Sequence, residues 1–411
     1  MTLVIQKYGG SSLADASAIR DVARRISATC HGGARVVAVV SAMGNTTDDL
    51  IALARRVSDR PDPRELDVLL STGELVSCTL MAMALRDIGH DSVSLSGAQA
   101  GIRTDTGHGR ARIAVVEPAR VTEELERDRI VIVAGFQGIT EDMNVTTLGR
   151  GASDLSAVAL AAGLGADRCE VYTDVDGIYT ADPRLVPDAR KLDEVGFEEM
   201  LEMASYGAKM APRSIEMAMN FGVSILVASS FSESPGTLIH GGASTMNSGV
   251  GEIRNRVRGI ATDSNVAKVT IRGVVDRPGV AAAVFEPLAA ADVSVDVIVQ
   301  NTSVDGATDI TFTVERNDLS RALEVVGAVV SDIGAGEILS SDSLAKISIV
   351  GTGMQNAPGY ASRMFLALSG AGVNIEMITT SEIRITCVVD EARLADAARA
   401  VHSAFELDRA E

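Results

Sequence analysis

The sequence predicts an α/β protein with a mainly parallel sheet covered by helices on both faces, followed by a smaller unit that occurs twice. Short β-branched runs alternate with longer helical stretches from residue 1 to about residue 240. The strand-like runs are almost continuously apolar, as in parallel sheets that are buried on both faces. Near the C-terminus, apolar and Pro-Gly positions recur 80 residues apart. The length of 411 residues allows two to three domains.

Six strands are expected in the first region, because each run is short and rich in Val and Ile. They are Leu3–Gln6, Arg35–Val40, Asp91–Leu95, Ile130–Ala134, Arg168–Tyr172 and Val223–Val227. The helices expected between them are Ala14–Ala28, Thr46–Val57, Glu65–Asp87, Pro118–Arg127, Ser153–Ala162 and Met203–Asn220. Ligands of such folds bind at the carboxyl ends of the strands, where glycine turns lead into helices.

The Gly- and Ser-rich stretch His240–Gly251 predicts a linker, and a tandem duplication follows it. Each copy is expected to run strand, Pro-Gly turn, helix, strand, strand, helix. The first copy carries Pro278-Gly279, Phe285, Leu288, Val293, Val295 and Ile298, and the second carries Pro358-Gly359, Phe365, Leu368, Val373, Ile375 and Ile378. We therefore predict a first domain over 1–240, a linker over 241–264, and repeats over 265–342 and 343–411. Both repeats are small, so we expect them to share a core.

Composition excludes several classes of function. The net charge of −18 and the 3% of aromatic residues, with no Trp, argue against nucleic acid and against an anionic membrane surface as partners. Four scattered cysteines without a C-x-x-C pair, and no basic apolar leader, predict a cytoplasmic protein with reduced thiols. The apolar run Ala157–Gly165 is too short to cross a bilayer. The five histidines lack metal-ligand spacing, so no protein-held metal site is expected.

Lysine is scarce, with five residues against 32 arginines, and Lys7 opens the segment Lys7-Tyr8-Gly9-Gly10-Ser11-Ser12. Two glycines allow the backbone to approach a ligand closely, and successive N–H groups in such a turn bind anions. A lysine adds a compact charge on a flexible stem, which suits a phosphate that moves during a reaction. The simpler alternative is a tight turn with a solvent-facing lysine. Neither a Walker A loop nor a three-glycine dinucleotide motif is present.

Three further segments carry candidate chemistry. In Leu148–Asp154, Gly149-Arg150-Gly151 precedes an alanine-rich helix, where Ser153 or Asp154 could cap the helix or the arginine could hold an anion. In Tyr172–Arg184, paired acidic residues before Gly177 fit either an Asx turn or contacts to a ribose and base. Lys209 is a second scarce lysine close to a glycine.

Together these four segments resemble the amino acid kinase family and, within it, the aspartate kinases. The run Thr173–Pro183 is also similar to segments of glutamate 5-kinases and uridylate kinases. The opening Lys-Tyr-Gly-Gly-Ser-Ser and a C-terminal pair that looks like tandem ACT domains make the resemblance specific. It implies a three-layer α/β/α catalytic domain followed by two βαββαβ, ferredoxin-like ACT domains. The implied activity is transfer of a phosphoryl group from ATP, with Mg²⁺, to the β-carboxylate of L-aspartate. That reaction is the first step of the lysine, threonine and methionine pathway.

The resemblance also implies roles for individual residues. The catalytic residues would be Lys7, Asp154 and Lys209. Aspartate would be bound by Ser41, Thr47, Glu74 (its amino group), Arg150 (its α-carboxylate), Gly151 and Ser153. The nucleotide and its phosphates would be held by Lys7, Gly9, Gly10, Thr173, Asp174, Tyr179, Asp182, Arg184, Lys209 and Met210.

For the ACT pair, the resemblance implies feedback inhibition by lysine, threonine or both. The effector contacts would be Asp276, Pro278, Gly279, Ser294, Val295, Asp296, Gln300, Asn374, Ile375, Ser381 and Glu382. ACT pairs normally complete their sheet with another chain, so a homo-oligomer is implied. Whether a separate regulatory subunit joins it stays open.

The sequence departs from the family pattern at Ala152, where a glycine is usual, and at Leu155-Ser156, where two threonines are usual. These departures leave the rate and the choice of amino acid open. One alternative is therefore a related kinase for another carboxylate in a specialised pathway. Another is a non-catalytic amino-acid sensor, which is disfavoured because the implied catalytic and substrate-binding charged residues are all present.

Overall fold

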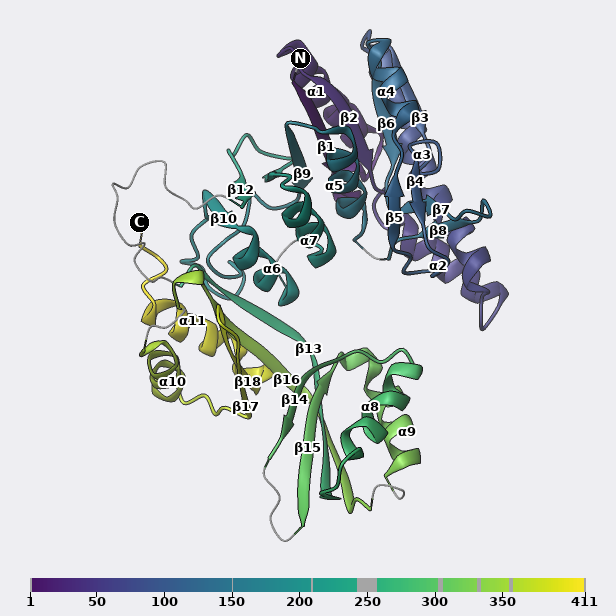
Figure 1. Ribbon diagram of the computed structural model, residues 1–411. Helices are drawn as coiled ribbons and strands as arrows, with labels where there is room; N and C mark the ends of the chain where they lie inside the picture. Colours follow the sequence, from purple (N-terminus) through teal and green to yellow (C-terminus); the bar gives the residue numbers. More distant parts are fainter. Residues whose placement is uncertain are drawn as a thin grey trace. The chain divides into compact units, whose positions relative to one another are not determined.

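The computed structural model describes residues 2–149, 151–207, 210–241, 257–301, 306–330, 334–354 and 358–409 (Figure 1). The chain divides into two compact units. The first takes Met1–Ile178 and Lys191–Gly251, and the second takes Tyr179–Arg190 and Glu252–Glu411. The described residues form two sheets in the first unit and one in the second. The expectation that the two repeats share a core is wrong, because the buried residues of the first repeat and those of the second form separate clusters.

In the first unit, the described residues form an eight-stranded sheet of order β10-β12-β11-β9-β1-β2-β6-β3. The neighbours from β11 to β3 all pair in parallel, while β12 runs antiparallel to β11. The strands are β1 (Leu3–Tyr8), β2 (Arg35–Val40), β3 (Ser92–Leu95), β6 (Ile130–Ala134), β9 (Arg168–Thr173), β10 (Glu194–Gly196), β11 (Ile225–Ser229) and β12 (Thr237–His240). The predicted mainly parallel sheet is thus confirmed, and the antiparallel edge was not predicted.

Helices cover both faces of this sheet. The first-unit helices are α1 (Ala16–His31), α2 (Thr46–Val57), α3 (Pro63–Asp87), α4 (Ala119–Glu126), α5 (Ser153–Leu164), α6 (Phe197–Ser205) and α7 (Pro212–Phe221). Alternate residues of β2 and β6, including Val36 and Ile132, share a core cluster with α1 and α3. The intervening residues, such as Val39, face the side on which α5 begins. This α/β/α layering buries the sheet and leaves its carboxyl edge for ligands.

In this unit one predicted helix was wrong, and one sheet was not predicted. The expected helix Met203–Asn220 is two helices, because Gly207 takes a φ of 103° and Pro212 begins α7. A second sheet of order β5-β4-β7-β8, also counted within the described residues, was not predicted. Its strands are β4 (Ile102–Thr104), β5 (Ile113–Val116), β7 (Gln137–Ile139) and β8 (Val145–Thr147). Three- and four-residue strands are too short to show a period in sequence.

Helix α3 is the one described helix that is long and apolar enough, by length and composition, to cross a membrane. Half of its apolar window is buried inside the protein, where Cys78, Met81 and Leu85 pack with the sheet. Two carboxylates, Asp67 and Glu74, are also buried on it. These contacts are those of a core helix of a globular domain.

In the second unit, the described residues form a six-stranded antiparallel sheet of order β14-β15-β13-β16-β18-β17. Its strands are β13 (Gly259–Val275), β14 (Val295–Gln300), β15 (Ala307–Val314), β16 (Glu337–Val350), β17 (Met377–Thr380) and β18 (Arg384–Asp390). Its helices are α8 (Val280–Ala290), α9 (Leu319–Val329), α10 (Tyr360–Gly370) and α11 (Leu394–Ala404). The predicted duplication is confirmed: both copies run strand, turn, helix, strand, strand, helix. Gly279 and Gly359 hold equivalent turns with φ of 92° and 106°.

The two long strands are shared between the repeats. Residues 267–275 of β13 pair with β15 and with the first part of β16, whereas 259–263 pair with 346–350 at the far end of β16. The second repeat therefore receives its fourth strand from residues that precede the first repeat. The predicted linker over 241–264 is wrong at this end, because Ile260 and Ala261 are buried strand residues. Residues 242–256 of that linker lie outside the described part of the chain.

Candidate active site

The candidate site lies at the carboxyl edge of the first sheet, where β9, β1, β2 and β6 end side by side. The turn after β1 and the loop after β2 touch through their backbones: the Gly44 N–H donates to the Gly10 carbonyl at 3.0 Å. A Cβ on Gly10 would stand 2.9 Å from the Ala42 carbonyl oxygen, so no larger residue fits there without a shift. The glycine turn is thus held by close packing with the next strand's loop.

Lys7 is fixed at this edge by an ion pair. Its Nζ lies 2.7 Å from Oδ1 of Asp154, and the two side chains are only 11% and 10% exposed. The same Nζ stands 3.5 Å from the place that a Cβ on Gly9 would take, so the ammonium group bends over the glycine turn. The alternative of a solvent-facing lysine is wrong. The structure places a nearly buried cation beside a tight glycine turn, which is an arrangement suited to phosphate.

Asp154 acts on Lys7 rather than as a helix cap. The N-cap position of α5 is Ala152, with φ −80° and no side-chain cap, so the suggestion that Ser153 or Asp154 caps the helix is wrong. In the first turn of α5, the Asp154 carboxylate that pairs with Lys7 lies at the end of the helix dipole that favours negative charge.

The departure from the family pattern at Ala152 introduces no backbone strain. Its φ of −80° is ordinary for any residue. Its side chain is buried in a small cluster with Phe136, Leu148 and Leu155, the last of which is itself a departure. The two unusual residues therefore pack together under the loop that precedes α5.

Glu74 is the unusual carboxylate of the site. It is 3% exposed, and its Oε1 accepts a hydrogen bond from the Ala42 N–H at 3.2 Å. Its Oε2 is buried and has no partner among the described residues. Burial raises the pKa of Glu74 to about 7, although backbone hydrogen bonds lower it in part. A buried, unpaired carboxylate oxygen is costly unless a cation binds it, so this position fits an ammonium group.

The other described members of the predicted substrate set lie just after β2 and at or just before the starts of α2 and α5. Ser41 follows β2 and donates its N–H to the Tyr8 carbonyl at 3.1 Å. Thr47 lies in the first turn of α2, and its neighbour Thr46 approaches Gly73, the residue before Glu74. Ser153 begins α5 and is buried, while Gly151 has a φ of 73°. Arg150 lies outside the described residues.

The predicted nucleotide residues fall in two places. Thr173 ends β9 in the first unit, and its Oγ1 donates to Oδ1 of the next residue, Asp174, at 3.0 Å. Met210 is buried in the same unit, and Lys209 lies outside the described residues. The second place is the segment Tyr179–Arg190, described next.

Tyr179, Asp182 and Arg184 belong to the second unit. The Arg184 guanidinium lies 2.6 Å from Asp182, so two predicted nucleotide contacts form an ion pair with each other. The neighbouring Ala181 and Val186 are buried in the core of the second repeat. Their role toward a nucleotide stays a prediction.

In the second unit, the predicted effector residues lie in two sets, one in each repeat. The first set lies at the turn before α8 and around β14, and most of its members are exposed; it comprises Asp276, Pro278, Gly279, Ser294, Val295, Asp296 and Gln300. The second set flanks β17, and it comprises Asn374, Ile375, Ser381 and Glu382. Their role in binding an effector stays a prediction.

Ion pairs link the repeats next to these sets. Asp296 of the first repeat pairs with the nearly buried Lys346, and Glu376 of the second pairs with Lys268 at 2.8 Å. Hydrogen bonding from Lys268 lowers the pKa of Glu376. Asp296 and Glu376 occupy equivalent positions, 80 residues apart. Lys268, Lys346 and Glu376 were not predicted from the sequence, although the scarcity of lysine was a usable signal.

Comparison with known proteins identifies the family. A family model described as "Amino acid kinase family" matches residues 2–229, and an ACT domain model matches 269–329 and 347–405. The chain is 50% identical over 413 residues to the aspartokinase of Mycolicibacterium smegmatis, covering 99% of this chain and 97% of the relative. The chain belongs to the aspartokinase branch of the amino acid kinase family.

Solved structures of aspartokinases resemble the whole chain. E. coli aspartokinase III, solved in complex with aspartate and ADP and described as the R-state, has a TM-score of 0.82 at 26% identity. The match covers 98% of this chain and 100% of that one. The same enzyme in complex with lysine and aspartate, described as the T-state, has a TM-score of 0.75 at 26% identity, with 98% and 99% covered. As a member of the aspartokinase family, the protein is an enzyme of the kinase class with a regulatory-type ACT pair.

Proposed function

We propose that the enzyme transfers the γ-phosphoryl group of ATP to the β-carboxylate of L-aspartate, giving 4-phospho-L-aspartate and ADP. The observation that carries the proposal is the unpaired, buried oxygen of Glu74 at the same sheet edge as the nearly buried Lys7–Asp154 pair. An amino acid with a second carboxylate offers an ammonium group for Glu74 and an anion for phosphorylation. The relatives named aspartokinase, and the complex of one of them with aspartate and ADP, support this choice.

The chemistry requires charge neutralisation more than a base. The β-carboxylate of aspartate has a pKa of about 3.9, so it is an ionised nucleophile at neutral pH. Its approach to the γ-phosphate costs about 4 kcal/mol of repulsion at ~4 Å and an effective dielectric constant near 20. The Lys7 ammonium group and the N–H groups of the Gly9–Gly10 turn can offset that repulsion without reorganisation. Catalysis is then positioning plus stabilisation of negative charge.

We include Mg²⁺ as the partner of ATP. No group of three His, Cys, Asp or Glu side chains that could hold a metal by itself occurs among the described residues, so the nucleotide's phosphates would supply most of the ligands. Asp154 is a carboxylate at this edge with the oxygen chemistry that Mg²⁺ prefers. When bound, the ion neutralises phosphate charge.

The proposal is tested by measuring ADP release with L-aspartate, L-glutamate, L-asparagine and succinate in the presence of hydroxylamine. We expect turnover with aspartate and capture of aspartyl hydroxamate. Succinate, which has both carboxylates but no ammonium group, should be at least about 100-fold poorer, because Glu74 is then left without a cation. If the enzyme prefers another of these acids, that acid replaces aspartate as the proposed substrate. If no acceptor is phosphorylated, a non-catalytic amino-acid sensor is favoured.

Glu74 also predicts a pH dependence. Its pKa is about 7 in the free enzyme, so the ionised form that accepts an ammonium group grows as pH rises from 6 to 8. We expect kcat/KM for aspartate to rise across this range with an apparent pKa near 7. The stability effect has the opposite sign: with the pKa raised from 4.5, the stabilising contribution is complete below that value and is lost as pH rises through about 7. A flat kcat/KM profile between pH 5.5 and 8 would contradict this role for Glu74.

We also propose that the ACT pair binds lysine, threonine or both and inhibits the kinase as part of a homo-oligomer. The lysine complex of E. coli aspartokinase III supports lysine as an effector. The strands β14 and β17 are the outer strands of the six-stranded sheet formed by the described residues, and such edges pair readily with another chain. Adding each amino acid, alone and together, to the aspartate assay tests the regulation, and light scattering tests the oligomer. Unchanged rates with both amino acids present would refute the regulatory proposal.

A further inference from the structure

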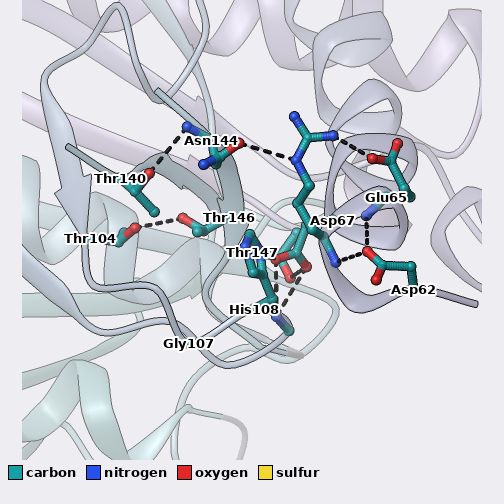
Figure 2. Close-up of polar contacts among 12 residues, drawn as sticks. Asp62, Glu65, Asp67, Thr104, Gly107, His108, Thr140, Asn144, Thr146 and Thr147 are labelled. Carbon is teal, nitrogen blue, oxygen red and sulfur yellow. Dashed lines mark hydrogen bonds and ion pairs between the residues drawn. The ribbon is translucent and has the colours of Figure 1, made fainter. Parts of the chain in front are cut away.

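A buried hydrogen-bond network lies on the same helix as Glu74. Asp67 of α3 is 1% exposed and receives three donors (Figure 2). Thr147 Oγ1 donates to its Oδ1 at 2.5 Å, His108 Nδ1 to its Oδ2 at 2.8 Å, and the Gly109 N–H to both oxygens at 3.0 and 3.1 Å. A carboxylate has acceptor sites for all three donors, whereas an amide oxygen alone does not. Nothing in the sequence motifs pointed to this aspartate.

The network fixes the end of β8. Thr147 is the last residue of that strand, and its carbonyl accepts the Ala111 N–H at 2.9 Å. In addition, the Arg213 guanidinium donates to the carbonyls of Leu148 and Ala111 at 2.7 and 2.9 Å. Hydrogen bonds therefore hold the backbone at Thr147 and Leu148, immediately before Gly149.

The same contacts shape the turn that follows. Gly149 has a φ of 96°, and the place that its Cβ would take is 3.7 Å from the Gly109 carbonyl oxygen. The Leu148 N–H donates to the Phe136 carbonyl at 2.9 Å, and Leu148 shares a buried cluster with Ala152 on the far side of the turn. Leu148 and Ala152, the residues on either side of 149–151, are thus both held in the interior.

We propose that Asp67 is a positioning residue for substrate binding: it sets the place of the Leu148–Gly149 segment relative to Glu74. Asp67 and Glu74 are seven residues apart and both buried on one rigid helix, a separation of about 10 Å along its axis. The segment that Asp67 holds is followed in sequence by Arg150, the residue to which the resemblance assigns the α-carboxylate and which lies outside the described residues. Helix α3 thus carries both Glu74 and the carboxylate that holds the segment before Gly149. This inference rests on the proposed function.

A matched pair of substitutions tests the inference. Thr147→Val removes the hydroxyl that donates to Asp67 and keeps the shape of the side chain. Thr146→Val removes an equally buried hydroxyl from the adjacent residue, which bonds Thr104 Oγ1 at 2.6 Å and does not contact Asp67 (Figure 2). We expect Thr147→Val to raise KM for aspartate about tenfold with KM for ATP and kcat changed by less than about twofold, and Thr146→Val to change none of them. Asp67→Asn should give the same pattern with a larger increase.

A second readout does not depend on the substrate. Amide hydrogen exchange in residues 148–152 of the free enzyme should speed up in Thr147→Val and stay at the wild-type rate in Thr146→Val. Equal effects of the two substitutions on both KM values, or unchanged exchange in Thr147→Val, would overturn the inference. If the wild type does not phosphorylate aspartate, the proposed function fails, and the exchange result alone still decides whether Asp67 holds this turn.

Discussion

Lys7→Ala is expected to lower kcat by a factor of about 10² to 10³, with a smaller change in KM for aspartate. The reason is that the Lys7 ammonium group lies nearly buried against the glycine turn, and its charge is needed most when the phosphoryl group is between donor and acceptor. Steady-state assays with ATP and aspartate measure the effect. Lys7→Arg should recover little, because a planar guanidinium cannot replace a compact ammonium group at a site this enclosed.

Lys191→Ala is the matched lysine control. Lys191 donates to the Gly236 carbonyl and lies 3.5 Å from Asp193, and none of these residues is predicted to bind substrate or nucleotide. Its removal should cost stability and leave kcat within about twofold. Full activity in Lys7→Ala would remove Lys7 from the mechanism, and equal losses in both variants would reduce its role to folding.

Glu74→Gln is expected to raise KM for aspartate about 100-fold and to collapse the preference for aspartate over succinate. Glutamine keeps the shape of the side chain but cannot offer a charged oxygen to the substrate ammonium group. The same substitution should stabilise the free enzyme at pH 8, because a carboxylate whose pKa is raised from 4.5 to about 7 carries a desolvation cost of about 3 kcal/mol when ionised. Kinetics with the two acids, together with thermal unfolding at pH 8, test both effects.

Glu170→Gln is the control for this variant. Glu170 is also buried in the first unit, but it accepts hydrogen bonds from Gln6, Tyr172 and Arg168. Its substitution should destabilise the protein and leave the ratio of aspartate to succinate turnover unchanged. If the Glu74→Gln enzyme still rejects succinate as the wild type does, another group binds the ammonium group of the substrate.

Much of the fold was predictable because its elements are regular and repeated. The limits of β2, β6 and α2 were predicted to the residue, since β-branched runs and amphipathic spacing mark them clearly. The single helix expected over Met203–Asn220 was wrong because the apolar spacing continues across Gly207 and Pro212, which break the backbone. The early start of β13 was missed because residues 259–263 pair with β16 of the second repeat, and no local sequence pattern shows such a distant pairing.

The site residues that lie in segments resembling the family's motifs could be predicted from the sequence. Lys7 and Asp154 are 147 positions apart in sequence, yet the structure brings them together as the resemblance implies. The unpaired oxygen of Glu74 depends on burial, which no motif shows. The placement of Tyr179 in the second unit depends on packing between distant segments, and so do the donors around Asp67.

The most direct test of the central claim follows the oxygen atoms of the substrate. Aspartate labelled with ¹⁸O in the β-carboxylate is incubated with unlabelled ATP, Mg²⁺ and hydroxylamine, and the phosphate is examined by mass spectrometry. If the β-carboxylate attacks the γ-phosphorus and ADP leaves, hydroxylamine then attacks the carbonyl carbon and releases phosphate that carries one ¹⁸O. We predict ¹⁸O-phosphate in an amount equal to the hydroxamate formed. Unlabelled phosphate would mean that water or another acceptor attacked ATP, and the proposed reaction would be wrong.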